Sequence, residues 1–403
     1  MVTVLGGIKK QKAYYLLGGK KMKKILALLM VLTLILSLAA CGKKTPTEET
    51  YGEEETTTET EATEGADTEA VTNEDVTVGF IYVGPIGDGG WTYAHDQGRL
   101  YLEEQLGVKT IYKESVPETQ DVEQEMRNMI DQGATVIFAT SFGYMDFMEK
   151  LSGDFPEVAF LHCSGYKTTD NMANYFGRIY QARYLSGIVA GMKTETNKIG
   201  YVAAFPIPEV IRGINAFTLG AQSVNPDVEV EVVWTSTWYD PAKEKEAAIA
   251  MLDNGADVIA QHQDTAGPQQ AAEERGLWSV GYNTDMSAMA PKAYMTAPVW
   301  NWGPYYVEQV QAVIDGTFAS HSYWGGMDDG IVALAPLTEN APEGAKEAVD
   351  AATAQILDGS ELVFDGPLTN QAGEVVVAEG AVMTDGEMLN MMWFVKGVIG
   401  NIE

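Results

Sequence analysis

Aromatic rings and carboxylates are the side chains of this 403-residue chain best suited to chemistry, and they gather in short polar stretches that follow apolar runs. Those expected at a binding site are Asp88, Trp91, Phe142, Phe205, Trp238, Asp264, Asp285 and Trp300. Aromatic faces stack on flat heterocycles, at about 1–3 kcal/mol per base in nucleic-acid complexes. Carboxylates accept hydrogen bonds from ring N–H groups and exocyclic amines. The combination predicts a planar, nitrogen-rich ligand, although sugar sites also use aromatic side chains and a sugar stays open.

Each of the three carboxylates also has a purely structural interpretation. Asp88 lies between two glycines, where it either caps a following helix or contacts a ligand. Asp264 and Asp285 each follow a predicted strand, so they face either a cleft or a helix N-terminus. We favour ligand contact for all three.

The aromatic residues divide in the same way between core and site. Phe142 and Phe205 follow strands, where core and cleft positions are both open. Trp91 either packs beneath its loop or faces the ligand. Trp300 and Trp302 occupy alternate positions, so in a strand they share a face, and we expect one of them in the core.

The sequence contains no recognisable catalytic or metal-binding arrangement. The glycine-rich stretch 84–90 lacks the Gly-Lys-Ser/Thr ending of a P-loop, and the motifs HExxH, GxSxG and CxxC are absent. The histidines do not have metal-ligand spacing: His95, His162, His262 and His321. We therefore expect no catalytic residue, no metal and no cofactor. A nucleoside-cleaving enzyme stays as an alternative to a binding protein.

An internal repeat predicts the elements that position these side chains. Strand-like and helix-to-strand segments recur in the same order, 121 or 122 residues further along the chain. Three correspondences at nearly one offset indicate two similar units, each alternating strands and helices. The paired ranges are 76–83 with 198–204, 131–137 with 253–259, and 158–161 with 279–282.

Such alternation predicts an α/β fold with parallel sheets that helices cover on both faces. Because ligands of open α/β sheets bind beyond the carboxyl ends of the strands, two facing units would enclose a cleft. This is the two-lobed architecture of periplasmic-type binding proteins, which close by hinge motion. The predicted lobes are 76–192 plus about 297–328, and 193–296 plus about 329–403.

The amino-terminal segment has the features of a secretory signal peptide. Two lysines precede the apolar run 25–36, which is shorter than the about 20 residues of a membrane span, and small residues follow it. The tetrapeptide LAAC, ending at Cys41, resembles the lipobox of bacterial lipoproteins. That resemblance implies a lipid on Cys41, cleavage before it, and a position on the extracytoplasmic face of the cell membrane. An uncleaved anchor helix is the alternative, and residues 1–21 are interpreted as a mis-called start.

The rest of the chain is strongly acidic. Residues 42–75 have too few apolar side chains to fold and are predicted to form a disordered tether. The net charge is −31, and it becomes −38 without the seven lysines of residues 1–41. Since such a chain repels nucleic acid and anionic lipid, neither is expected as a partner. Cys163, in an apolar run, is expected to be buried and unreactive.

Several of these segments, taken in order, resemble the basic membrane protein family of lipoprotein receptors for ABC importers, many of which bind purine nucleosides. The resemblance covers residues 76–335, and the last 65 residues carry less of it. It implies a type I periplasmic-binding-protein fold, an ABC permease as partner, and a base stacked between aromatic residues of the two lobes. The matching segments are VGFI at 78–81, QGATVI at 132–137, RYLSGIVAG at 183–191, KIGYV at 198–202 and GYNTD at 281–285.

Two departures from that family bear on the ligand. The first loop reads Gly-Asp-Gly-Gly-Trp, where nucleoside receptors commonly have Asp-x-Ser/Gly-Phe-Asn. The crossing segment carries Val299-Trp300, where they commonly have Val-Lys reaching the ribose. Tryptophan offers one N–H donor where lysine offers three, so a free base such as adenine is favoured over a nucleoside. The alternatives are a nucleoside held by Asp264 and Asp285, with Trp300 in the hinge, or a sugar or autoinducer.

Overall fold

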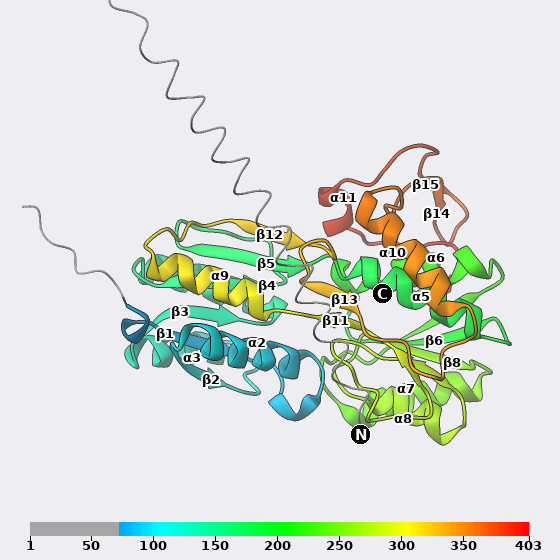
Figure 1. The fold of residues 1–403 in the computed structure, drawn as a ribbon, viewed down its shortest axis with the longest axis horizontal. Helices are drawn as coiled ribbons and strands as arrows, with labels where there is room; N and C mark the ends of the chain where they lie inside the picture. The colour runs from blue at the N-terminus through cyan, green and yellow to red at the C-terminus, as the bar shows by residue number, and fades with distance from the viewer. Residues whose placement is uncertain (1–71, 403) are drawn as a thin grey trace, which may run out of the picture. The chain divides into compact units, whose positions relative to one another are not determined.

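The computed structural model describes residues 72–402 (Figure 1). The predicted signal peptide, the Cys41 lipobox and nearly all of the acidic tether lie outside the described residues. Within residues 72–402, every helix is too short or too polar to cross a lipid bilayer.

The first sheet has six parallel strands in the order β12-β5-β4-β3-β1-β2. Its strands are β1 (Thr77–Ile81), β2 (Lys109–Lys113), β3 (Ala134–Ala139), β4 (Ala159–Cys163), β5 (Met172–Gly177) and β12 (Ser322–Gly325). Helices α2 (Trp91–Leu106) and α9 (Gly303–Ile314) pack on one face, and α3 (Asp121–Asp131) and α4 (Met145–Asp154) pack on the other. We call this sheet with its helices the first lobe.

The second sheet repeats this arrangement, with parallel strands in the order β10-β9-β8-β6-β7-β16. Its strands are β6 (Lys198–Ala203), β7 (Glu229–Trp234), β8 (Val258–Gln261), β9 (Trp278–Val280), β10 (Tyr294–Thr296) and β16 (Val398–Ile399). Helices α5 (Tyr180–Lys193), α6 (Pro208–Val224) and α10 (Ala345–Asp358) cover one face, and α7 (Pro241–Asp253) and α8 (Gly267–Glu274) cover the other. This is the second lobe. The predicted α/β fold with two parallel sheets is confirmed.

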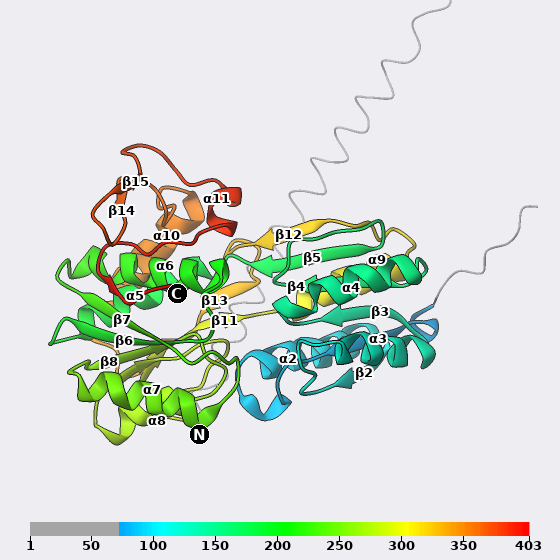
Figure 2. The same cartoon turned by 180° about the vertical axis from the view of Figure 1, so that it is seen from behind.

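Short elements complete the molecule. The segments that cross between the lobes include the antiparallel pair β11 (Pro298–Trp300) and β13 (Val332–Leu334), which lies between the sheets in both views (Figures 1 and 2). The carboxyl-terminal segment adds β14 (Leu368–Thr369), β15 (Val375–Val377) and α11 (Asp385–Leu389). Three 3-10 turns are η1 (Asn73–Asp75), η2 (Ile86–Asp88) and η3 (Phe142–Tyr144).

Strand periodicity explains why both faces of each sheet are covered. In β3, Val136 and Phe138 pack beneath α2 and α9, whereas Ile137 and Ala139 pack beneath α3 and α4. Successive side chains of a strand point to opposite faces, so a strand buried on both sides is apolar throughout. Cys163, at the end of β4, is completely buried, as predicted.

Helix α5 packs against α6 at very short range. A Cβ atom on Gly187 would overlap the Phe217 carbonyl oxygen, and one on Gly220 would overlap the carbonyl oxygen of Tyr184. Glycine is therefore required where these two backbones touch. The lobe ranges expected from sequence placed residues 180–192 with the first sheet, whereas in the structure this helix belongs to the core of the second.

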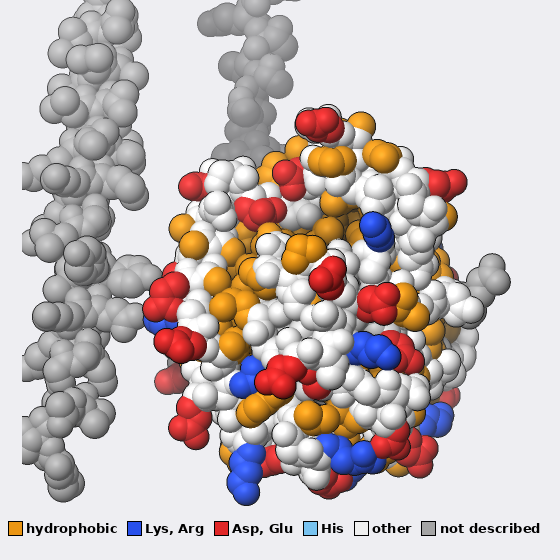
Figure 3. Space-filling model, turned by 90° about the vertical axis from the view of Figure 1, so that its right-hand side faces the viewer, with side chains coloured by type: hydrophobic (Ala, Val, Ile, Leu, Met, Phe, Trp, Pro, Cys, Tyr) orange, Lys and Arg blue, Asp and Glu red, His pale blue; other side chains and the backbone are white. Residues whose placement is uncertain are grey.

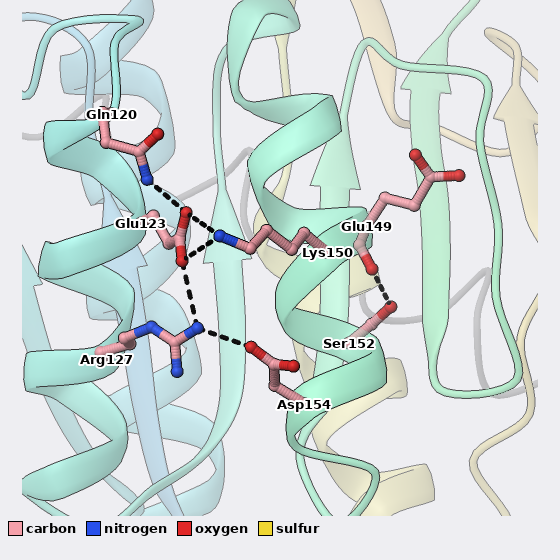
Figure 4. A network of polar contacts seen from close by, with 7 residues as sticks. All are labelled: Gln120, Glu123, Arg127, Glu149, Lys150, Ser152 and Asp154. Atoms are coloured by element: carbon pink, nitrogen blue, oxygen red, sulfur yellow. Dashed lines mark hydrogen bonds and ion pairs between the residues drawn. The ribbon is translucent and has the colours of Figure 1, made fainter.

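A polar network joins α3 to α4 on the surface of the first lobe (Figure 4). Glu123 accepts hydrogen bonds from Lys150 Nζ at 2.8 and 2.9 Å and from Arg127 at 3.1 Å, and Arg127 also pairs with Asp154 at 2.6 Å. The contacts with Lys150 and Arg127 lower the pKa of Glu123 to about 2. On the face seen from the side of the second lobe, acidic, basic and apolar side chains are intermingled (Figure 3).

Candidate functional site

A cavity lies between the lobes, where strands of both sheets end. The first lobe supplies side chains that follow β1, β3 and β4, and the second supplies side chains that follow β6, β7, β8 and β9. This is where open α/β sheets place their ligands. We call it the inner cavity. It is lined by Val83, Trp91, Ser141, Phe142, Ser164, Glu209, Trp238, His262, Asp264 and Tyr282.

Aromatic rings form much of the lining, and neighbouring groups hold them in place. Trp91 is the first residue of α2, and its Nε1 donates a hydrogen bond to the Thr140 carbonyl oxygen at 2.7 Å. Trp238 lies edge-on against Phe205, with ring centroids 4.9 Å apart. An indole fixed by its own hydrogen bond presents a defined flat surface to a ligand.

Four of the eight expected site residues line the inner cavity: Trp91, Phe142, Trp238 and Asp264. Phe205 packs edge-on against Trp238 and is not among the residues that line this cavity. Asp285 is exposed and accepts a hydrogen bond from Ser287 N at 2.9 Å, within its own loop.

Asp88 caps α2. Its carboxylate accepts hydrogen bonds from the backbone N–H groups of Gly90, Thr92 and Tyr93, at 2.8, 2.9 and 3.0 Å. These donors are the unpaired amides of the first helical turn. Burial nevertheless raises the pKa of Asp88 to about 6. The capping role that the sequence left open is therefore present, and the side chain does not line the inner cavity.

Trp300 supports the lining from behind. It is buried, donates from Nε1 to Asn283 Oδ1 at 2.9 Å, and stacks on Trp302 with ring centroids 4.6 Å apart. Its ring lies 5.7 Å from that of Trp91 and 6.4 Å from that of Tyr282. Both tryptophans of the crossing segment thus belong to a buried aromatic cluster.

The lobes touch directly beside Asp264. A Cβ atom on Gly90 would overlap the Asp264 carbonyl oxygen, so only glycine allows this approach. The Asp264 carboxyl is buried and accepts from Asn283 Nδ2 at 3.2 Å. Burial, and then the nearby charge of Asp88, hold the pKa of Asp264 well above its usual range. Asn283 and the cavity-lining Ser164 have φ angles of +70° and +65°, a strained conformation that marks many binding sites.

Sequence reasoning missed several members of the lining, among them Glu209, His262 and Tyr282. His262 lies near Asp264, and Tyr282 lies next to Asn283, in loops already expected at the cleft. Their position in the sequence could therefore have identified them as lining residues. Glu209 is the second residue of α6 and directly follows the loop 205–208 expected at the cleft. A carboxylate in the first turn of a helix is ordinarily explained by its interaction with the helix dipole. The sequence therefore does not indicate that Glu209 also lines a cavity.

A buried arginine lies behind His262 and Tyr282. Arg183 of α5 donates to the Gln261 carbonyl oxygen at 2.6 Å and contacts His262 Nδ1 at 3.2 Å, and its guanidinium lies 3.5 Å from the centre of the Tyr282 ring. Arginine can only donate, so Nδ1 of His262 must accept. Burial lowers the pKa of His262 to about 4, so the ring is neutral near pH 7 and carries its proton on Nε2, 3.4 Å from Glu209 Oε1.

A wider cavity adjoins the inner one. It is open to solvent and shares Phe142, Ser164 and Glu209 with the inner cavity. Helix α11 and Asn390 after it form part of its wall. Its other polar lining groups include Asn174, Arg212 and Ser322.

The model of a known family, described as ABC transporter substrate-binding protein PnrA-like, matches residues 75–363. The chain belongs to this family. The resemblance to the basic membrane protein family is thereby confirmed, and the receptor is a solute-binding protein rather than an enzyme. The matched range ends before α11, so this part of the wider cavity's wall lies outside the family pattern.

The receptor has similar relatives with different named cargoes. A purine-binding protein of Brucella abortus is 44% identical over 327 residues, which cover 81% of this chain and 93% of that protein. A putative ABC transporter glucose-binding protein of Haloferax volcanii is 39% identical over 348 residues, covering 86% of each chain. A solved solute-binding protein from Aeropyrum pernix shares the fold, with a TM-score of 0.63 at 20% identity over 71% of this chain and 92% of that one.

Proposed function

We propose that this receptor captures a purine-type ligand in the inner cavity and delivers it to an ABC permease. The observation that carries this proposal is the lining itself, which combines flat rings with the carboxylate of Glu209 and the buried carboxyl group of Asp264. Rings stack on a heterocycle, and carboxylates accept from its N–H and amino groups. The name of the Brucella relative supports the same ligand class.

The charge of the lining limits the ligand further. Among the ten lining residues there is no lysine or arginine. A phosphate within the inner cavity would be desolvated beside Glu209 with no cationic side chain in the lining, which is costly; the cation of the adjoining wider cavity is Arg212. We therefore propose a neutral, donor-rich base or nucleoside and not a nucleotide.

Within that class we favour a free base such as adenine. The position where nucleoside receptors of this family commonly carry a ribose-binding lysine is Trp300, which packs behind the lining and uses its N–H on Asn283. The support for a free base is that no lining residue carries an amino group that could bind a ribose. Trp300 gives no direct support, because it does not itself face the ligand.

A nucleoside is the second candidate, and the wider cavity favours it. Ser164, Asn174 and Ser322 offer hydroxyl and amide groups beside the inner cavity, where a ribose would extend from a stacked base. A sugar is the third, supported by the name of the Haloferax relative.

Calorimetry with adenine, adenosine, guanine, guanosine and D-glucose distinguishes these candidates. Free bases are expected to bind most tightly. Nucleosides that bind tenfold tighter than their bases, a gap of about 1.4 kcal/mol, would refute the free-base proposal. Tight binding of glucose alone would refute the purine proposal. Mass spectrometry of small molecules released from the denatured protein gives an independent identification.

We also propose that the receptor is a lipoprotein anchored through Cys41 on the extracytoplasmic face of the cell membrane. The support is the apolar run followed by LAAC in the sequence. Acyl chains contribute about 0.8 kcal/mol per buried CH₂, so a diacylglyceryl group with a third chain would hold firmly. Metabolic labelling with palmitate is expected for the unmodified protein and not for Cys41→Ser, and equal labelling would contradict the anchor.

A further inference from the structure

One carboxylate touches both lobes beside the inner cavity. Glu118 lies in the loop between β2 and α3, and its Oε1 accepts from Ser141 Oγ at 2.5 Å and from Gly143 N at 2.8 Å, both in the first lobe. Its other oxygen, Oε2, accepts from Trp238 Nε1 of the second lobe at 3.1 Å. The two oxygens of this partly buried group therefore serve opposite sides of the cleft.

The partners of Glu118 hold two aromatic members of the lining. Phe142 lies between Ser141 and Gly143, so the hydrogen bonds to Oε1 fix the backbone that presents its ring. Trp238 is held directly, through its indole N–H. Both Phe142 and Trp238 line the inner cavity. The position of each ring thus depends on the same carboxylate.

The surroundings show that this arrangement is closely fitted. A Cβ atom on Gly143 would lie 2.6 Å from Glu118 Cδ, so the carboxylate and the backbone of η3 are in tight contact. The loop that carries Trp238 contains Ser236 at a φ of +56°, a strained conformation that persists only where surrounding contacts enforce it.

We propose that Glu118 is a positioning residue that couples the two aromatic walls and latches the lobes around a bound ligand. The proposal rests on the proposed function only in taking the inner cavity as the binding site, and it holds for any ligand bound there. A carboxylate is needed because both oxygens accept. A glutamine in its place has one oxygen, so its NH₂ group would face a donor either on Trp238 or on Gly143. Glutamine can therefore serve one lobe but not both.

A double-mutant cycle tests the coupling, with adenine affinity measured by calorimetry and its dissociation rate by stopped flow. Glu118→Gln is expected to weaken binding about tenfold, mainly through faster dissociation, because a hydrogen bond to a charged group is lost. Trp238→Phe keeps a flat ring and removes the donor. If the two groups act together, adding Trp238→Phe to Glu118→Gln costs much less than it does alone. Fully additive effects would overturn the proposal.

Glu114→Gln is the matched control. Glu114 lies in the same loop and accepts from Ile86 N at 2.5 Å, wholly within the first lobe. Its loss is expected to leave adenine affinity within about twofold, since it touches neither aromatic wall. A loss as large as that of Glu118→Gln would mean that the loop merely loosened, and would overturn the latch.

A second readout separates the latch from the choice of ligand. If the unmodified protein binds no purine, the proposed function fails, and the cycle is run with D-glucose. The Trp238 indole N–H resonance, identified by its loss in Trp238→Phe, is recorded in the purified protein with and without each compound. It is expected to move upfield in Glu118→Gln and to stay in place in Glu114→Gln. A resonance unmoved by Glu118→Gln in every condition would overturn the proposal.

Discussion

Arg183 is a buried cation, and among residues 72–402 no carboxylate forms an ion pair with it. Its contacts are instead the Gln261 carbonyl, His262 and the face of Tyr282. Two of these residues, His262 and Tyr282, line the inner cavity. The charge of Arg183 therefore acts on the cavity through them and not by direct contact with a ligand. It fixes which nitrogen of His262 carries the proton and thereby which group faces Glu209.

Arg183→Met tests this role. The substitution keeps most of the side-chain volume but removes the donor to Nδ1, and about tenfold weaker ligand binding is expected, near 1.4 kcal/mol. The ¹⁵N shifts of His262 should show a mixture of tautomers in place of one. Arg275→Met, which removes an exposed pair with Asp253, is the control and should change neither quantity. An unchanged tautomer in Arg183→Met would contradict the assignment.

Asp88 and Asp264 predict that capture depends on pH. Burial raises both pKa values, to about 6 for Asp88, and opening the cleft would return them towards about 3.9. The closed form then binds protons more tightly than the open form, so closure is favoured at low pH and weakens as pH rises through 6. Affinity for adenine is expected to fall several-fold between pH 5 and pH 7.5, and less in Asp88→Asn. A flat profile in the unmodified protein would argue against this linkage.

At the scale of elements, the contact between α5 and α6 sets a sharp steric limit. Gly187→Ala should destabilise the fold by about 1–3 kcal/mol, because its methyl group would overlap the Phe217 carbonyl oxygen. Gly153→Ala, in α4, has no atom within 4 Å of the new methyl group and should be neutral or stabilise by up to about 1 kcal/mol. Thermal unfolding of the two variants checks this contrast, and equal melting temperatures would refute it.

The internal repeat was sufficient to predict three strands of each sheet. Its matched segments are β1 with β6, β3 with β8 and β4 with β9. The sheets share one order around them, β2-β1-β3-β4-β5 in the first and β7-β6-β8-β9-β10 in the second. The glycines after α3 and α7, Gly133 and Gly255, have φ angles of +93° and +95°, which is why the same DxG turn recurs. Local sequence determines such features, and so a sequence pattern reveals them.

The cavity lining was only partly predictable, because it depends on how the lobes meet. Trp91 and Asp264 follow strands and were found by that rule. Glu118 and Arg183 reach the site from a surface loop and from a covering helix, and nothing in their neighbouring residues indicates it. Trp300 shows the opposite error, since a tryptophan in a crossing segment resembles a ligand contact yet packs behind the lining.

At the scale of the whole molecule, the two lobes are expected to close as rigid bodies around the ligand. The sequence predicts hinges near residues 190–198, 293–300 and 325–332. In the structure the chain passes between the sheets after β10 and β12, near the second and third of these ranges. Its first crossing follows β5, which ends at Gly177, and not residues 190–198, because α5 already packs on the second sheet. Small-angle scattering should show a smaller radius of gyration with saturating ligand than without it. An unchanged profile would count against hinge closure, although not against binding.

The outermost strands of the two sheets have a consequence for synthesis. Strand β12 pairs with β5 through residues 148 positions apart, Asn174 and Ser322, and β16 pairs with β7 through Val230 and Val398. Neither sheet can therefore be completed from a continuous stretch of nascent chain. Because such distant pairings form slowly, the edge of β5 stays unpaired at least until β12 has been synthesised, and the edge of β7 until β16 has been. The first sheet can consequently be completed once β12 has been synthesised, whereas the second sheet waits for β16 further along the chain.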